Sequence, residues 1–121
     1  MTLKVKFPQI GRKNLTIQVV GRVEPGDDSI QQLFSIVGLA SPEMSGLRID
    51  SVLFALQEKA GLLLWWDRDG ADLILPLESR GAFSFSYPIH SPKGWDGVMY
   101  YSMFKIDEPK HLYLTLECEP L

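Results

Sequence analysis

A chain of 121 residues with 45% hydrophobic and 22% charged side chains has the size and composition of one globular domain, which excludes disorder over most of its length. Its net charge of −3 argues against a direct nucleic-acid partner, because gripping a phosphate backbone requires clustered Lys and Arg. The longest apolar run, residues 61–66, is too short to cross a bilayer, and residues 1–7 alternate charged and apolar side chains unlike a secretory signal, so no membrane partner is expected.

Charge is divided unevenly along the chain. Residues 1–22 hold five basic residues and no acidic one, whereas residues 23–121 hold seven basic and fifteen acidic residues. The basic residues include Lys4, Lys6, Arg12 and Lys13. We expect residues 1–22 to form a basic strand or arm that touches an acidic surface of a neighbouring copy or of another protein.

The first half of the chain gives a mixed strand signal. Leu3, Val5 and Phe7 alternate with polar residues, which predicts a half-buried strand that Pro8 ends. A second strand is predicted over residues 15–20, and turn-forming residues follow it at 25–28. Residues 29–38 fit either a short helix or a strand, and we favour a strand. Residues 40–46 are expected to form a loop.

The strand pattern is clearest over residues 47–118. Alternating apolar residues between turn signals predict strands at 47–55, 62–66, 73–77, 81–86, 98–104 and 111–117. Pro76 suggests an edge strand or a bulge, and Phe83 and Phe85 are expected to face the core. Eight or nine strands at this spacing predict an all-β fold. We expect a single antiparallel β-sandwich over residues 1–121, with a jelly roll as one form of it.

One predicted strand is apolar on both faces. Leu62, Leu64 and Trp66 share one face, and Leu63 and Trp65 share the other. Exposing both faces to water would be costly, so this strand belongs in the middle of a sandwich or beneath a partner. We expect Leu63 and Trp65 to pack against a neighbouring copy of the chain.

Aromatic residues after the predicted strand at 81–86 are candidate contact residues. Trp95 lies in a glycine-flanked loop, and Tyr100 and Tyr101 are adjacent in a predicted strand, so one of the two tyrosines must point away from the core. Exposed Trp and Tyr side chains often anchor protein partners, and we expect Trp95 and Tyr101 to do so. Such residues also stack on sugar rings, so a carbohydrate-binding β-sandwich module with a glycan partner is the alternative of another class.

The residues that could carry chemistry form no recognisable reaction centre. Asp67, Asp69 and Asp72 surround Gly70 and suggest either a hairpin turn, which we favour, or a cation site. The two histidines lack the spacing of a zinc site, and no serine lies in a nucleophile-elbow motif. The single cysteine, Cys118, fits a reducing compartment and a buried place in the last strand. We predict no enzyme activity, no catalytic residue, no metal and no cofactor.

Five segments occur in a notable order: residues 47–52, a Trp-centred strand at 64–67, a Gly-x-Phe-x-Phe strand at 81–85, a glycine-rich loop and strand at 94–102, and a Leu-x-Leu strand at 112–117. In order and spacing they resemble a family of small all-β proteins encoded by tailed bacteriophages. The chain departs from that pattern by lacking an Asp after Gly97 and by carrying Trp95 in the loop, so a role tied to that acid does not carry over.

The resemblance implies a non-enzymatic structural protein of the virion and brings no catalytic residue with it. The expected role is a capsid decoration or cement subunit, and neck, tail and fibre components are the alternatives. The expected partners are further copies of the chain, in a homo-oligomer for which a trimer is one option, and the major capsid protein or other virion proteins.

Overall fold

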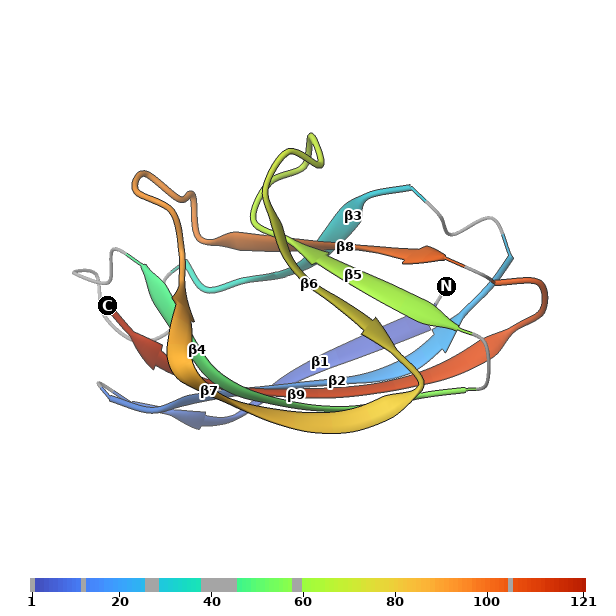
Figure 1. The fold of residues 1–121 in the computed structure, drawn as a ribbon, viewed down its shortest axis with the longest axis horizontal. Coiled ribbons are helices and arrows are strands. Elements are labelled where there is room, and N and C mark those ends of the chain that lie inside the picture. The colour runs from blue at the N-terminus through green and yellow to red at the C-terminus, as the bar shows by residue number, and fades with distance from the viewer. Residues whose placement is uncertain (1, 12, 26–28, 38–45, 58–59, 105) are drawn as a thin grey trace.

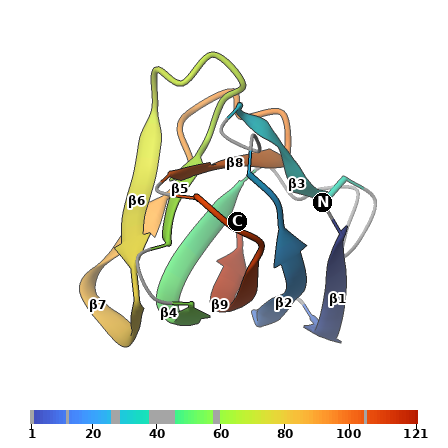
Figure 2. The same cartoon turned by 90° about the vertical axis from the view of Figure 1, so that its right-hand side faces the viewer.

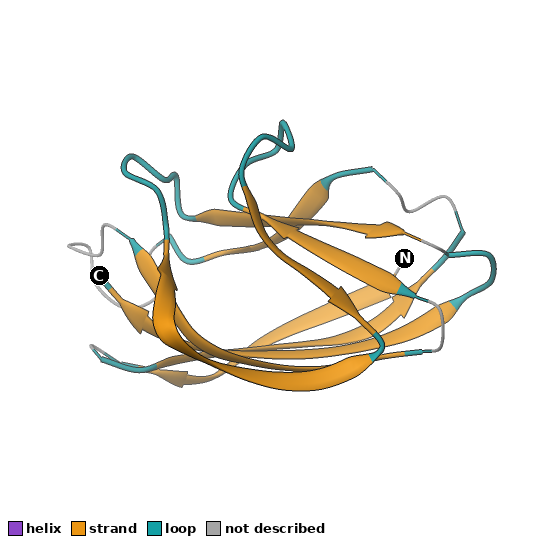
Figure 3. Ribbon diagram, in the orientation of Figure 1, coloured by secondary structure: helices purple, strands orange, loops and turns teal. Residues whose placement is uncertain are grey.

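The computed structural model describes residues 2–11, 13–25, 29–37, 46–57, 60–104 and 106–121. All regular elements in these ranges are β-strands (Figure 3). They are β1 (Thr2–Ile10), β2 (Leu15–Val23), β3 (Gln31–Ser35), β4 (Leu47–Leu56), β5 (Gly61–Trp65), β6 (Leu73–Glu78), β7 (Arg80–His90), β8 (Val98–Phe104) and β9 (Lys110–Pro120). Strand β3 confirms the preference for a strand over a helix within residues 29–38, whereas the predicted loop at 40–46 lies almost wholly outside the described residues.

The strands form two antiparallel sheets that face each other in a sandwich-like arrangement (Figure 1). One sheet has five strands in the order β1-β2-β9-β4-β7, and the other has four in the order β3-β8-β5-β6. The five-stranded sheet curves beneath the four-stranded one, and the view from the end separates the two layers (Figure 2). The predicted all-β fold with antiparallel sheets is confirmed.

The core lies between the sheets, where alternate residues of each strand point inward. Ile17 of β2 and Leu116 of β9 are register partners in the five-stranded sheet, and both are fully buried. Leu64 of β5 and Tyr101 of β8 are the equivalent pair in the four-stranded sheet. Burial of one large apolar side chain contributes about 1.5–3 kcal/mol, so these opposed layers provide the main driving force for folding and fix the register.

Strand β1 continues past Pro8, where the sequence pattern predicted its end. Its register against β2 shifts between Lys6 and Gln9, and this irregularity accommodates the proline. Because β1 is an edge strand, the missing N–H of Pro8 need not break a ladder hydrogen bond. The ring of Phe7 meets Phe34 of β3 edge to face, with centroids 6.2 Å apart, and links the two sheets on this side.

On the opposite side, the chain passes between the sheets through a single residue. Ser79 lies between β6 and β7 with a φ of 62°, and its carbonyl accepts a hydrogen bond of 2.6 Å from the N–H of Leu56. Strand β6 is an edge strand, as Pro76 suggested. Phe83 of β7 stacks on Phe54 with centroids 5.8 Å apart but is 50% exposed. The prediction of Phe83 as a core residue is therefore wrong, because β7 is the outermost strand of the wider sheet.

Cys118 of β9 is buried, as expected from the sequence. Its register partners are Leu15 of β2 and Ile49 of β4, and its side chain belongs to the core. Burial raises the pKa of the thiol far above its ordinary range, because the thiolate would lose its hydration.

We expect iodoacetamide to alkylate Cys118 about a hundredfold more slowly in the folded protein than in denaturant. Because the folded-state pKa is the higher one, the free energy of unfolding should also fall as the pH rises above about 8.5, the ordinary thiol value. Denaturant unfolding of Cys118→Ala should lack this component of the pH dependence. Identical pH slopes for the two proteins would contradict the assignment.

Candidate functional site

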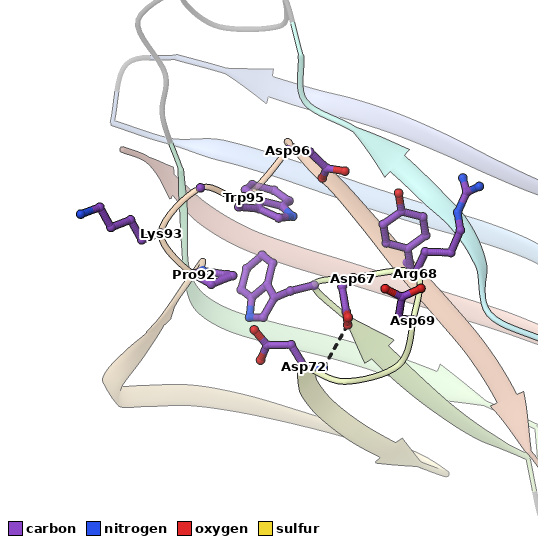
Figure 4. Close-up of a pocket in the computed structure, with 11 residues that line it drawn as sticks. Asp67, Arg68, Asp69, Asp72, Pro92, Lys93, Trp95 and Asp96 are labelled. Carbon is purple, nitrogen blue, oxygen red and sulfur yellow. Dashed lines mark hydrogen bonds between the residues drawn. The ribbon is translucent and has the colours of Figure 1, made fainter.

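Two loops line an open groove of about 370 Å³ (Figure 4). Residues 66–72 connect β5 to β6, and residues 91–97 connect β7 to β8. Both loops rise beyond the four-stranded sheet in Figure 1. The groove combines the rings of Trp66, Trp95 and Tyr100 with charged side chains from both loops. It is the place where two separate sequence candidates, Trp95 and the aspartate-rich turn, meet in space.

Trp95 holds the two loops together. Its ring meets Trp66 edge to face with centroids 4.9 Å apart, and its Nε1–H donates a hydrogen bond of 2.8 Å to the carbonyl of Val98. Trp66 is only 4% exposed, whereas Trp95 is partly exposed. One side of the Trp95 ring therefore packs within the protein, and only the rest of the ring faces the groove.

Asp67 organises the loop between β5 and β6. Its carboxylate accepts hydrogen bonds from the backbone N–H of Ala71 (3.2 Å) and of Asp72 (3.0 Å). Gly70 in the same loop has a φ of 73°, which glycine adopts without strain. The favoured interpretation as a turn is confirmed, and among the described residues no group of three or more His, Cys, Asp or Glu side chains is placed to hold a metal ion.

Asp96 stabilises the loop between β7 and β8 in the way that Asp67 stabilises the other loop. Its carboxylate accepts a hydrogen bond of 3.0 Å from the backbone N–H of Val98. Gly94 and Gly97 have φ angles of 79° and 88°, which glycine adopts without strain. A Cβ at Gly97 would lie 2.9 Å from the side chain of Val37, and this close approach also favours glycine there.

Tyr100, and not Tyr101, lies on the outer face of the four-stranded sheet. Tyr101 is fully buried in the core, so the prediction that it contacts a partner is wrong. The guanidinium of Arg68 lies 5.4 Å from the centroid of the Tyr100 ring, within the range of a cation–π contact, and Tyr100 is only 6% exposed. This tyrosine forms part of the groove floor and offers little free ring surface.

Leu63 and Trp65 lie on the same outer face and are partly exposed. The indole N–H of Trp65 donates a hydrogen bond of 3.0 Å to the hydroxyl of Ser102. The loop between β5 and β6 passes beside Trp65, since a Cβ on Gly70 would lie 4.0 Å from the indole ring and 2.7 Å from Ile30. The chain itself thus provides part of the cover that the apolar outer face needs, which weakens the sequence argument for a partner there.

The basic candidates lie at one side of the molecule, away from the groove. Lys4 and Lys6 are exposed on β1, and Lys13 is exposed in the turn between β1 and β2. Arg12 lies outside the described residues. Residues 2–10 form an edge strand that pairs with β2, which agrees with the strand alternative of the predicted basic strand or arm. The predicted contact residues are therefore spread over three surfaces and do not form one site.

Several groove residues were not singled out from the sequence. Arg68, Lys93 and Asp96 line the groove, and they come from two loops that each adjoin a tryptophan. That shared feature was visible in the sequence, but it does not show that the two loops meet. The meeting follows from the sheet topology.

No family model, no curated protein and no solved structure matches the chain. Among the residues that the structure describes, no helix is long and apolar enough to span a membrane.

We expect Asp67→Ala to lower the free energy of unfolding by about 1 kcal/mol, because two backbone N–H groups lose their acceptor. Asp69→Ala is the matched control, since it removes an exposed acid from the same loop, and it should change stability by less than about 0.5 kcal/mol. Urea unfolding followed by tryptophan fluorescence measures both. Equal losses in the two variants would show that the carboxylate of Asp67 does not organise the loop.

Proposed function

We propose that the protein is a non-enzymatic structural subunit of a tailed-bacteriophage virion, bound to the capsid surface as a decoration or cement protein. The observation that carries the proposal is the nested order of strand pairing. Strand β5 pairs with β6, β4 with β7, β3 with β8 and β2 with β9. We interpret this order as a jelly roll with β1 added to one sheet, an architecture that viral capsid domains use repeatedly.

The hydrogen bonds that the acidic and aromatic groove residues form with their own loops support a structural role. The carboxylates of Asp67 and Asp96 accept backbone hydrogen bonds, and the indole N–H of Trp95 donates to a backbone carbonyl. Groups tied to their own loops in this way give a surface of fixed shape, which lowers the entropy cost of binding a partner. The resemblance of residues 47–117 to small phage proteins points in the same direction.

The basic side of the sandwich suggests how the subunit attaches. Lys4 and Lys6 project from an edge strand, and Lys13 lies in the adjoining turn, while the rest of the chain is acidic. An acidic patch on the major capsid protein is the complementary surface. A position at the neck, tail or fibre would use the same chemistry with another virion protein as partner.

The protein should therefore copurify with phage particles released from the bacterial strain that carries its coding sequence. Mass spectrometry of density-purified particles should find it in a fixed ratio to the major capsid protein, and cryo-electron microscopy should place it on the outer surface. Intact particles that lack the chain, with all of it in the soluble fraction, would contradict the proposal.

Changing Lys4 and Lys6 together to Ser should weaken binding to particles stripped of the protein by about tenfold at low salt. The difference should shrink at roughly 0.5 M salt, because screening shortens the range of the attraction. The control Arg80→Ser with Lys93→Ser removes the same charge from exposed positions elsewhere. If both pairs weaken binding equally, net charge and not the basic side of the sandwich governs attachment.

A second candidate function, carbohydrate binding, is favoured by the composition of the groove. A partly exposed Trp95 adjoins the acidic side chains of Asp69 and Asp72, and glycan sites combine an aromatic surface with polar groups of this kind. Jelly rolls are also the architecture of many lectins.

If the groove binds a glycan, soluble polysaccharides should change the tryptophan fluorescence in a saturable way. Trp95→Ala should abolish the response, whereas Trp65→Phe, which alters a tryptophan outside the groove lining, should retain it. A flat titration with the unmodified protein would remove this candidate and leave the virion proposal in place.

A further inference from the structure

The sandwich has four edge strands, and three of them carry features that block pairing with another chain. Strand β1 projects Lys4 and Lys6 and contains Pro8, strand β3 has five residues with a register shift, and strand β6 has six residues with Pro76 in its middle. Short length, lysines, prolines and irregular register are the usual means by which proteins protect a sheet edge.

Strand β7 carries such features only outside residues 81–84: Arg80 precedes them, and a register shift and Pro88 follow them. It has eleven residues, and residues 81–90 contain no Lys, Arg, Asp or Glu. Its only described ladder partner is β4, so its other side is a free edge. Pro88 and the register shift against β4, which falls between Ser84 and Ile89, lie in the second half of the strand. Residues 81–84 keep a regular register with β4 and offer backbone N–H and C=O groups for another strand to pair with.

Apolar side chains are exposed along the same edge. Seven large hydrophobic residues are exposed in the described part of the chain, and three of them lie on β7 or on the neighbouring strand: Leu53 (49%), Phe83 (50%) and Tyr87 (92%). Leu53 of β4 is the register partner of Ala82, so its side chain lies directly beside the edge. Pairing along residues 81–84 would therefore also bury apolar surface.

We propose that β7 pairs antiparallel with β7 of a second copy of this chain, about a two-fold axis. The absence of charge on this part of the edge favours a second copy of the chain as the partner. Residues 81–84 carry no charge and meet their own copy without repulsion, whereas the Lys4 and Lys6 edge of β1 would repel itself. An acidic or basic peptide finds no complementary charge on residues 81–84. The proposal goes beyond the virion role, because it rests on the edge alone and holds for the free protein.

Joining two five-stranded sheets through β7 makes one continuous sheet with a β1 edge at each end. The two basic edges then point outward on opposite sides of the dimer. A dimer of this form attaches to a repetitive acidic surface through two contacts, which raises its effective affinity without any new contact residue.

Sedimentation equilibrium tests the pairing with two variants at an exposed position of the edge. Ser84→Lys and Ser84→Glu should each weaken the dimer by at least about tenfold, because like charges then lie opposite or diagonal to each other close to the two-fold axis. An equimolar mixture of the two variants should recover a dimer. Gln32→Lys, at an exposed position on the β3 edge, is the control and should associate like the unmodified protein.

Cysteine cross-linking tests the same geometry. In an antiparallel pair about a two-fold axis, a residue faces its own copy only at the axis, and other residues face a different position of the partner. Among Ala82→Cys, Ser84→Cys and Ser86→Cys, tested singly and in equimolar pairs, one combination should therefore oxidise to a covalent dimer, and Gln32→Cys should not. The native Cys118 is buried and does not interfere.

A monomer at about 100 µM would overturn the pairing. A trimer, or a dimer insensitive to charge at position 84, would overturn it too and would point to the Leu63 and Trp65 face instead. None of these outcomes bears on whether purified particles contain the chain, so failure of the pairing and failure of the virion role are distinguishable.

Discussion

The pairing of β9 with both β2 and β4 is the constraint on which the rest of the structure depends. Strand β9 lies in the middle of the five-stranded sheet, and Leu114 is the register partner of both Val19 and Phe54 in a fully apolar row. The pairing joins the two ends of the chain, and Thr16 and Glu117, which share a side-chain hydrogen bond across it, are 101 positions apart. Closing so long a loop costs chain entropy, which the burial of continuous apolar faces offsets. The inner pairs of the nested order lie between these ends.

The groove is a consequence of this pairing. The nested order brings the end of β5 and the end of β7 to the same side, so the loops that follow them adjoin. The sheets cannot by themselves fix loop conformation, and side chains do so instead: the indoles of Trp66 and Trp95 meet edge to face, and Asp67 and Asp96 satisfy backbone N–H groups. Trp95 and Asp67, which were candidate functional residues in the sequence, thus help to fix the shape of the surface that they line.

Much of the fold is predictable because the apolar residues that alternate along a strand are the ones that the structure buries, as it does Leu15, Ile17 and Val19. The sequence does not predict which face of a strand points into the core when both faces are apolar. Residues 98–103 are of this kind, and only the pairing with β5, which sets Tyr101 opposite Leu64, decides which tyrosine faces the core. The sequence also does not predict where a strand lies within its sheet. Phe83 has the alternation of a core residue but lies on an edge strand, and Pro8 is tolerated inside β1 because that strand is also at an edge. The groove depends on loops that meet only through long-range topology.

The two outer strands of the five-stranded sheet differ in a way that folding does not require. Positions 82, 84 and 86 of β7 are exposed, so lysine or glutamate there would bury no charge and would disturb no core contact. Strand β1 places lysines at equivalent exposed positions at its own edge, which shows that this sheet accommodates them. The uncharged state of the β7 edge is therefore not imposed by the sandwich. An exposed and partly apolar edge carries a risk of aggregation, which the proposed pairing with a second copy would remove by covering that edge.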